Sequence, residues 1–394
     1  MDSSSEVKKK KSVREVVFKL LWKGFCQNLY IEDLLPPNFF KDPRDQALAF
    51  EICSGTIRYW SQLQWIAETL TSTGKLSLKN REKSLLFSAL YQIYYLERVP
   101  HYAVIDETVK LAKTYCHASV GNFFNGILRK ASETPLKLPD GDSPFALSIR
   151  YSQTLFFVKR LLKERGASEA IKILSSSNIR PKHFVRTIGL PIQYTPMTMP
   201  IAEIQGYIQN PTPGHLATFL SQSTTPPKTI LDLCASPGGK LLLAHDLYPS
   251  AKLWANDVSD ARIALLNENI AKFGLEVNVR IGTGESYPAE MLFDLIILDV
   301  PCSNSGVLNK RIEARGRLTE EALSNLQTMQ QKLLQAAIQL LAPGGAIWFL
   351  TCSVLKEENE AATAVPGLEK VCELTYFPDE EGMDGGYCCL LKKI

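Results

Sequence analysis

The sequence predicts an all-α domain followed by an α/β domain built on a mostly parallel sheet with helices on both faces. Three observations support this fold class. The chain of 394 residues is longer than a single core normally fills. Its first 130 residues repeat apolar side chains at helical spacing, without the alternation of a strand. From about residue 225, short apolar runs alternate with amphipathic helical stretches.

The helical spacing is clearest near the start of the chain. Val13, Val17 and Leu20 lie three or four residues apart and form one apolar face. Similar stretches continue to about residue 131 and predict a bundle of five or six helices. Residues 132–144 are rich in Pro, Gly, Ser and Asp, as a linker is. The expected segments are an all-α domain at 1–138, a linker and small mixed connector at 139–205, and the α/β domain at 206–394.

The second half of the chain contains apolar runs typical of buried strands. They occupy residues 228–235, 251–258, 276–282, 293–300 and 344–353. Ligands of parallel α/β sheets bind beyond the carboxyl ends of the strands. Cys234, Asp257, Asp299 and Cys352 all fall at such ends, so we expect a binding site there.

Composition and charge exclude some classes of protein. The chain is 45% hydrophobic and 22% charged, and none of its apolar runs approaches the roughly 18 residues of a membrane span. Residues 1–140 hold 20 Lys and Arg against 15 Asp and Glu, a basic excess that suits docking to a polyanion. The lysine run 8–11 is either a solvated tail or a phosphate-contacting arm. With no apolar segment behind it, it is not a signal peptide.

Cysteine and histidine usage indicates free thiols. Nine cysteines are scattered without C-x-x-C spacing, and the five histidines form no H-x-x-x-H pair. The pattern argues against a disulfide framework and a zinc site. We therefore expect a cytoplasmic protein with no metal and no membrane segment.

A glycine turn begins the α/β domain. In residues 231–240, Gly238 and Gly239 let the backbone approach a ligand at the start of a helix. The G-x-G-x-x-G fingerprint is absent, which disfavours a nicotinamide oxidoreductase. Asp257 ends the next strand, where an acidic side chain can accept hydrogen bonds from ribose hydroxyls. Each feature alone is equally a structural turn or cap, but together they favour a nucleoside-containing cofactor.

Several stretches resemble one enzyme family, the Sun-type (RsmB-like) RNA 5-methylcytosine methyltransferases. They are LDLCASPGGK at 231–240, NDVS at 256–259, LDVPCSNSGV at 298–307 and TCSVLKEEN at 351–359. Residues 99–113 and 121–132 resemble the NusB-like RNA-binding domain of that group, and residues 384–393 its last hairpin. The resemblance implies a Rossmann-like S-adenosylmethionine methyltransferase domain preceded by an all-α NusB-like helical domain.

The resemblance also implies roles for particular residues. C5 of cytosine is a poor nucleophile, and a thiolate added at C6 activates it. By resemblance Cys352 is this nucleophile, Cys302 assists product release, Asp299 contacts the base and Lys240 reaches the cofactor or the base carbonyl. The cofactor is S-adenosyl-L-methionine, and the residues implied to bind it are Cys234, Ala235, Ser236, Pro237, Gly238, Gly239, Lys240, Asp257, Arg262 and Asp299.

The sequence departs from the family pattern at several places, and two of them concern the site. Thr283 stands where the family often has an acidic residue that contacts the adenine amine. Downstream of Cys302, the arginines and the tryptophan common in the family are partly replaced in this sequence. The basic residues that remain there, Lys310, Arg311 and Arg315, are expected to contact RNA. Arg262 is also explained by a solvated helix face. The two cysteines, taken without the flanking motifs, are also explained as structural residues or as a redox pair.

The leading substrate is a cytosine of small-subunit ribosomal RNA, with transfer RNA as the alternative. A DNA cytosine methyltransferase would use the Pro-Cys thiol and would not need Cys352. A non-catalytic NusB-like RNA-binding factor would have no use for either thiol, nor for Asp299 and Lys240. We expect a monomer.

Overall fold

The computed structural model describes residues 12–27, 35–36, 38–198 and 203–393. The chain divides into two units, Met1–Val158 and Lys159–Ile394, called here the helical unit and the sheet unit. The finer division into three segments remains a prediction. The lysine run 8–11 lies outside the described residues.

The helical unit confirms the predicted bundle. Its described helices are α1 (Val13–Gln27), α3 (Pro43–Arg58), α4 (Trp60–Leu70), α5 (Asn80–Tyr95), α6 (His101–Tyr115), α7 (Ala118–Glu133) and α8 (Pro144–Arg150). Helix α5 is central, because Leu86, Phe87 and Leu90 are fully buried against the other helices. Helix α3 begins where Asp42 accepts a hydrogen bond from the Arg44 N–H and Pro43 occupies the first turn.

The sheet unit opens with elements that precede its main sheet. Most of α9 (Leu155–Ser176) belongs to this unit, and the helix is interrupted at Gly166, whose φ of 76° is not helical. Three short antiparallel strands follow in the order β2-β1-β3: β1 (Phe184–Arg186), β2 (Tyr194–Pro196) and β3 (Tyr207–Ile208). Helix α10 (Pro211–Ser221) then leads into the main sheet.

The main sheet has seven strands in the order β6-β5-β4-β7-β8-β10-β9. Their bounds are β4 (Thr229–Asp232), β5 (Lys252–Asp257), β6 (Val277–Ile281), β7 (Phe293–Asp299), β8 (Leu341–Thr351), β9 (Leu368–Tyr376) and β10 (Gly386–Lys393). The strands from β6 to β8 pair in parallel, and β10 runs antiparallel to both β8 and β9. This mixed sheet with a parallel core confirms the predicted Rossmann-like fold.

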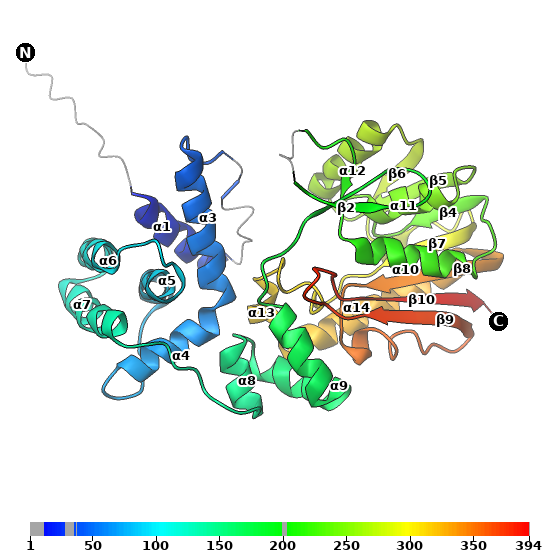
Figure 1. Ribbon diagram of the computed structural model, residues 1–394. Helices are drawn as coiled ribbons and strands as arrows, with labels where there is room; N and C mark the ends of the chain where they lie inside the picture. The colour runs from blue at the N-terminus through cyan, green and yellow to red at the C-terminus, as the bar shows by residue number, and fades with distance from the viewer. Residues whose placement is uncertain (1–11, 28–34, 37, 199–202, 394) are drawn as a thin grey trace, which may run out of the picture. The chain divides into compact units, whose positions relative to one another are not determined.

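Helices cover both faces of the sheet (Figure 1). On one face, residues such as Ile230 and Ile297 pack with α10, α11 (Gly239–Leu247) and α12 (Asp260–Phe273). On the other, Leu231 and Leu298 pack with α14 (Glu320–Gln339). Neighbours along a strand point to opposite faces, so a strand covered on both sides is apolar throughout. This is why the strands read as continuous apolar runs.

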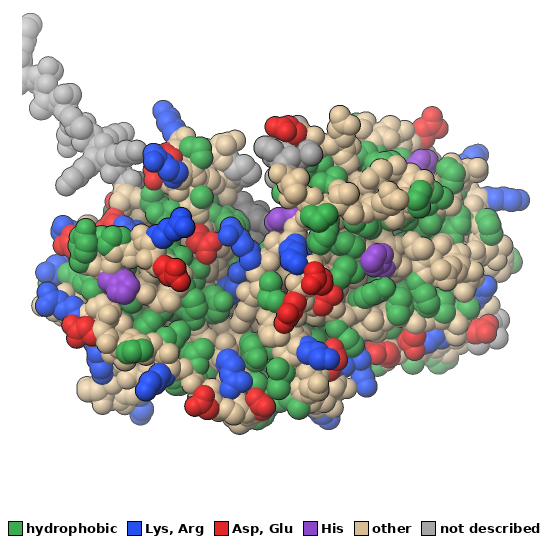
Figure 2. Space-filling view, viewed as in Figure 1, with side chains coloured by type: hydrophobic (Ala, Val, Ile, Leu, Met, Phe, Trp, Pro, Cys, Tyr) green, Lys and Arg blue, Asp and Glu red, His purple; other side chains and the backbone are tan. Residues whose placement is uncertain are grey.

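The visible surface carries charges of both signs. Figure 2 shows lysine and arginine side chains interspersed with acidic ones over this face of the molecule. Within the described residues, none of the helices combines the length and apolar character needed to cross a membrane.

Candidate active site

The loop after β4 carries the glycine turn predicted from the sequence. Gly238 has a φ of 102°, which glycine adopts far more easily than other residues, and it precedes the first turn of α11. A Cβ on Gly239 would lie 2.9 Å from both Gln209 Nε2 and Tyr207 Cε1. The turn therefore packs tightly against Tyr207 of β3 and Gln209, which follows the strand.

Asp257 ends β5 and ties this loop in place. Its carboxylate accepts hydrogen bonds from the backbone N–H groups of Ser236 (2.8 Å) and Val258 (2.7 Å). Arg262, on the first turn of α12, pairs with the same carboxylate at 3.0 Å. A carboxylate offers about four acceptor positions, so Asp257 can still accept from a ribose hydroxyl.

Asp232, the last residue of β4, is buried at the same edge of the sheet and lacks a full set of partners. One oxygen accepts a hydrogen bond of 3.3 Å from the Cys234 N–H. The other, Oδ2, has no hydrogen-bond partner among the described residues. Burial, reinforced by the nearby Asp299, raises the pKa of Asp232 to about 8. Such an orphaned acceptor suits a cationic ligand group.

Lys240 and Asp299 form an ion pair beside the glycine turn, with Nζ and Oδ2 2.5 Å apart. Their side chains remain 26% and 31% exposed, so both can reach a bound molecule. Burial lowers the pKa of Lys240, but Asp299, together with Cys352 and Asp232, more than offsets this, and the pKa of the ammonium is raised overall. Lys240 is therefore a cation at neutral pH.

The two predicted thiols meet at this edge. Strands β7 and β8 are parallel neighbours with Asp299 opposite Leu350, so the loops after them start side by side. The sulfurs of Cys302 and Cys352 lie 3.2 Å apart. Cys352 Sγ also lies 3.2 Å from Asn304 Oδ1. The hydrogen bond with Cys352, together with burial, raises the pKa of Cys302 well above its ordinary value of 9.0, so Cys302 holds its proton.

A buried acid joins the two thiol loops. Glu358 is wholly buried and accepts hydrogen bonds from Ser303 and Ser353, the residues that follow the two cysteines. Burial raises the pKa of Glu358, although the three donors oppose this. Asn359 completes the loop by accepting from Thr351 Oγ1 at 2.6 Å and donating to the Ser353 carbonyl at 3.0 Å.

The residues at this edge fit S-adenosylmethionine. The orphaned Asp232 oxygen suits the ammonium of its amino-acid part, and the turn at Gly238 and Gly239 admits a ligand against the backbone. Asp257, near the end of β5, suits its ribose. Within the described ranges, no group of three or more His, Cys, Asp and Glu could hold a metal ion.

The structure brings together the predicted catalytic residues Cys302, Cys352, Lys240 and Asp299 and sets the loop 234–239, Asp257 and Arg262 beside them. One expectation is wrong: Arg315 is 4% exposed and bonds to Asn178 and the Ser177 carbonyl, so it holds the fold instead of contacting RNA. Lys310 pairs with Asp384 at 2.8 Å.

Sequence reasoning missed Asp232 and Glu358 as site residues, although both lie inside the quoted motifs. Glu358 lies five residues after the second Cys-Ser pair, a spacing that does not by itself indicate a contact with Ser303. The Thr283 hydroxyl, in the position expected near the adenine, lies 2.7 Å from that of Ser286.

A mostly parallel sheet with a glycine turn, a strand-end acid and paired thiols at one edge is the arrangement expected of a Rossmann-like methyltransferase. Residues 220–371 match the family described as 16S rRNA methyltransferase RsmB/F, and residues 9–133 match the NusB family. Two family models, one of a methyltransferase and one of NusB, thus match different parts of the chain. The match to a methyltransferase family confirms the prediction of S-adenosyl-L-methionine as the cofactor.

Relatives match over most of their length. The ribosomal RNA small subunit methyltransferase B of Sodalis glossinidius is 29% identical over 369 residues, covering 84% of this chain and 83% of that protein. The protein of the same name from Salmonella paratyphi C is 28% identical, covering 90% and 89%. The chain in the crystal structure of PH0851 is 18% identical in sequence, and the match covers 97% of this chain and 99% of that one. Its TM-score of 0.76 shows that the two chains share a fold.

Proposed function

We propose that this protein transfers a methyl group from S-adenosylmethionine to C5 of a cytosine in small-subunit ribosomal RNA. The observation that carries the proposal is the pair of sulfurs 3.2 Å apart, at the carboxyl ends of adjacent parallel strands and beside the Lys240–Asp299 pair. The relatives named as ribosomal RNA small subunit methyltransferases support the RNA class.

Cys352 is the nucleophile in this proposal. Its thiolate adds to C6 of the cytosine, and the ring electrons move toward C5. Cys302 holds its proton and can donate a hydrogen bond across the 3.2 Å to the Cys352 sulfur, which stabilises the thiolate before attack. S-adenosylmethionine, when bound, supplies an electrophilic methyl group.

Asp299 and Lys240 activate the base. Asp299 is partly exposed at the end of β7, three residues before Cys302, and its carboxylate can accept from the N4 amine of cytosine. Lys240 neutralises Asp299 and places a cation where negative charge develops on the ring. Both roles require that the cytosine can reach the ion pair, and the partial exposure of the two side chains allows this.

Release reverses the first step. The C5 proton leaves to water, its bonding electrons form the C5–C6 double bond, and the C6–S bond breaks toward Cys352. The departing sulfur becomes a thiolate again, and the Cys302 thiol donates its hydrogen bond to it. Cys302 thereby lowers the barrier to product release.

The substrate could be recognised by both units. Target cytosines in structured RNA must be exposed or flipped before C6 can be attacked. The NusB-family domain would contribute contacts away from the chemistry. Transfer RNA is the alternative substrate of the same chemistry. Cytoplasmic location, a monomeric state and the absence of a metal remain predictions.

The test uses unmodified small-subunit ribosomal RNA, S-adenosylmethionine and three proteins: wild type, Cys302→Ala and Cys352→Ala. On denaturing gels, Cys302→Ala should accumulate a covalent protein–RNA adduct and Cys352→Ala should form none. Adduct only with Cys352→Ala would reverse the two roles. No adduct and no methyl transfer on ribosomal or transfer RNA would favour a non-catalytic RNA-binding factor.

A further inference from the structure

We propose that Glu358 is a positioning residue: its buried carboxylate holds the Cys302 loop against the Cys352 loop and so permits release of the methylated RNA. The inference rests on the proposed function, because it assigns the bond to RNA to Cys352 and the release to Cys302. It adds a residue that touches neither RNA nor cofactor.

The carboxylate of Glu358 bridges two segments about 50 residues apart. Oε1 accepts from the Ser303 N–H at 2.8 Å. Oε2 accepts from two hydroxyls, that of Ser303 at 2.5 Å and that of Ser353 at 2.6 Å. Ser303 and Ser353 each follow one of the two thiols directly. One side chain thus fixes the backbone next to both sulfurs.

Burying a carboxylate is costly unless donors compensate for its lost hydration. Glu358 is 0% exposed, and its three donors all come from the serines of the thiol loops. It sits at the end of a single-turn helix, η3 (Lys356–Glu358), which does not itself need an acid there. The contacts of the side chain point to the loops and not to the helix.

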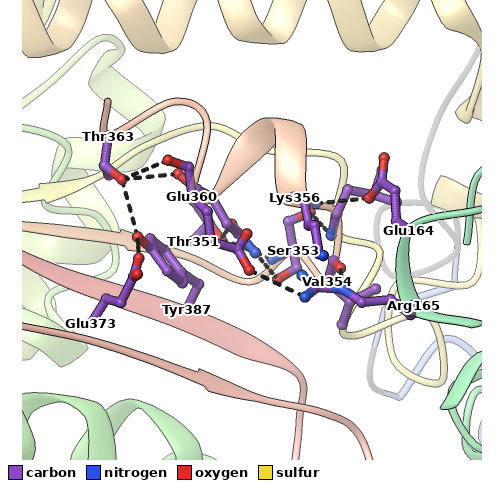
Figure 3. A network of polar contacts seen from close by, with 12 residues as sticks. Glu164, Arg165, Thr351, Ser353, Val354, Lys356, Glu360, Thr363, Glu373 and Tyr387 are labelled. Atoms are coloured by element: carbon purple, nitrogen blue, oxygen red, sulfur yellow. Dashed lines mark hydrogen bonds and ion pairs between the residues drawn. The ribbon is translucent and has the colours of Figure 1, made fainter. Parts of the chain in front are cut away.

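The two loops depend on Glu358 to different degrees. The two loops are also joined directly, because the Gly306 N–H donates to the Cys352 carbonyl at 2.9 Å and the Val354 N–H donates to Ser305 Oγ at 3.0 Å. The Cys352 loop has further anchors outside the Cys302 loop. From α9, Arg165 donates to the Val354 carbonyl at 3.0 Å and Glu164 accepts from the Lys356 N–H at 2.9 Å (Figure 3).

The part of the Cys302 loop next to the thiol depends mainly on Glu358. Both strong hydrogen bonds of Ser303, from its N–H and its hydroxyl, go to Glu358. Beside it, the Pro301 carbonyl accepts from Gln330 at 3.0 Å and the Cys302 carbonyl accepts from Asn304 at 3.2 Å. The other anchors of this loop, at Ser305 and Gly306, lie farther from the thiol. Loss of Glu358 therefore displaces the Cys302 thiol more than the Cys352 thiol.

Glu358→Gln is the most informative substitution because it keeps the size of the side chain. Its NH₂ group would replace Oε2, on which two hydroxyl donors converge. The Ser353 hydroxyl already accepts from the Leu355 N–H at 3.0 Å, so it could accept from the new NH₂ group only by turning its own proton toward Ser305 Oγ, 2.9 Å away. The contact between the loops then weakens, and the Cys302 thiol shifts relative to Cys352.

The experiment compares Glu358→Gln with Glu357→Gln, a matched control. The Glu357 side chain points elsewhere, pairing with Arg160 at 3.3 Å, and is 22% exposed. Each variant is incubated with unmodified ribosomal RNA and S-adenosylmethionine, and the covalent adduct, turnover and KM for RNA are measured. Cys302→Ala serves as the positive control for adduct, and the double variant Glu358→Gln, Cys352→Ala as the negative one. Circular dichroism verifies folding.

We expect Glu358→Gln to accumulate adduct although both cysteines are present, with turnover reduced about 100-fold, the scale of a displacement of about 1 Å in a catalytic group. KM for RNA should stay within about twofold of wild type, and Glu357→Gln should behave as wild type. Adduct with Cys302→Ala but none with folded Glu358→Gln would overturn the positioning role alone. No adduct with Cys302→Ala would overturn the proposed function first. If Glu358→Gln does not fold, Glu358→Asp, which keeps the charge, takes its place with the same outcomes.

Discussion

Replacing Asp232 by Asn should change how the stability of the sheet unit depends on pH. Asp232 is 1% exposed, its Oδ2 has no hydrogen-bond partner among the described residues, and Asp299 lies nearby. Burial and this like charge raise its pKa to about 8, from an ordinary value of 3.8. Asparagine has nearly the same shape and does not ionise in this range.

The direction in which pH changes the stability follows from where Asp232 binds its proton. Below pH 3.8 the carboxyl is protonated in both the folded and the unfolded chain, so the protonated form contributes its full stability. Between 3.8 and about 8 the folded chain holds the proton and the unfolded chain does not, so stability falls as pH rises. From pH 5 to pH 8 the loss is about 4 kcal/mol, since each pH unit is worth about 1.4 kcal/mol. For a unit of this size, that is roughly 10 °C in Tm.

The assay is thermal unfolding by circular dichroism from pH 5 to pH 8 in wild type, Asp232→Asn and the surface control Asp260→Asn. The Tm of Asp232→Asn relative to wild type should rise by roughly 10 °C across this range, while Asp260→Asn follows wild type. Parallel curves for wild type and Asp232→Asn would refute the assignment of a protonated, buried Asp232.

Three further outcomes follow from the same contacts. Calorimetry at pH 7 in buffers of different ionisation enthalpy should show proton release when S-adenosylmethionine binds wild type, because a cation near Asp232 favours its charged form, and none with Asp232→Asn. Replacing Arg186, which is fully buried and paired with Asp246, by Ala should lower the free energy of unfolding by about 3–5 kcal/mol. The loss would be measured as a lower Tm, and an unchanged Tm would contradict it. Gly239→Ala should weaken S-adenosylmethionine binding about tenfold, or about 1.4 kcal/mol, because the new Cβ would lie 2.9 Å from Tyr207 and Gln209; equal affinity by calorimetry would show that the turn can yield.

The position of the site could be predicted because it depends on local patterns. Continuous apolar runs identify parallel strands, and the carboxyl ends of such strands lie at one edge of the sheet. Cys302 and Cys352 follow neighbouring strands, so the fold alone brings them close. The glycine turn was visible because Gly238 and Gly239 stand together at a helix start.

The roles of Glu358, Asp232 and Arg315 could not be predicted in the same way. Glu358 acquires its partners from a loop about 50 residues away, and the fate of Arg315 depends on Asn178, 137 residues earlier. Asp232 differs from an ordinary strand-end acid only by burial and the absence of a partner for one oxygen. Charge and spacing in the sequence carry no record of these tertiary contacts.

The central claim is that methylation occurs at C5 of cytosine through attack at C6. Small-subunit ribosomal RNA carrying tritium at C5 of its cytosines tests it most directly, because the C5 hydrogen must leave for each methyl group gained there. Tritium release should equal methyl transfer, and both should be absent in Cys352→Ala. Methyl transfer from S-adenosylmethionine without tritium release would contradict the account and assign the methyl group to another position of the RNA.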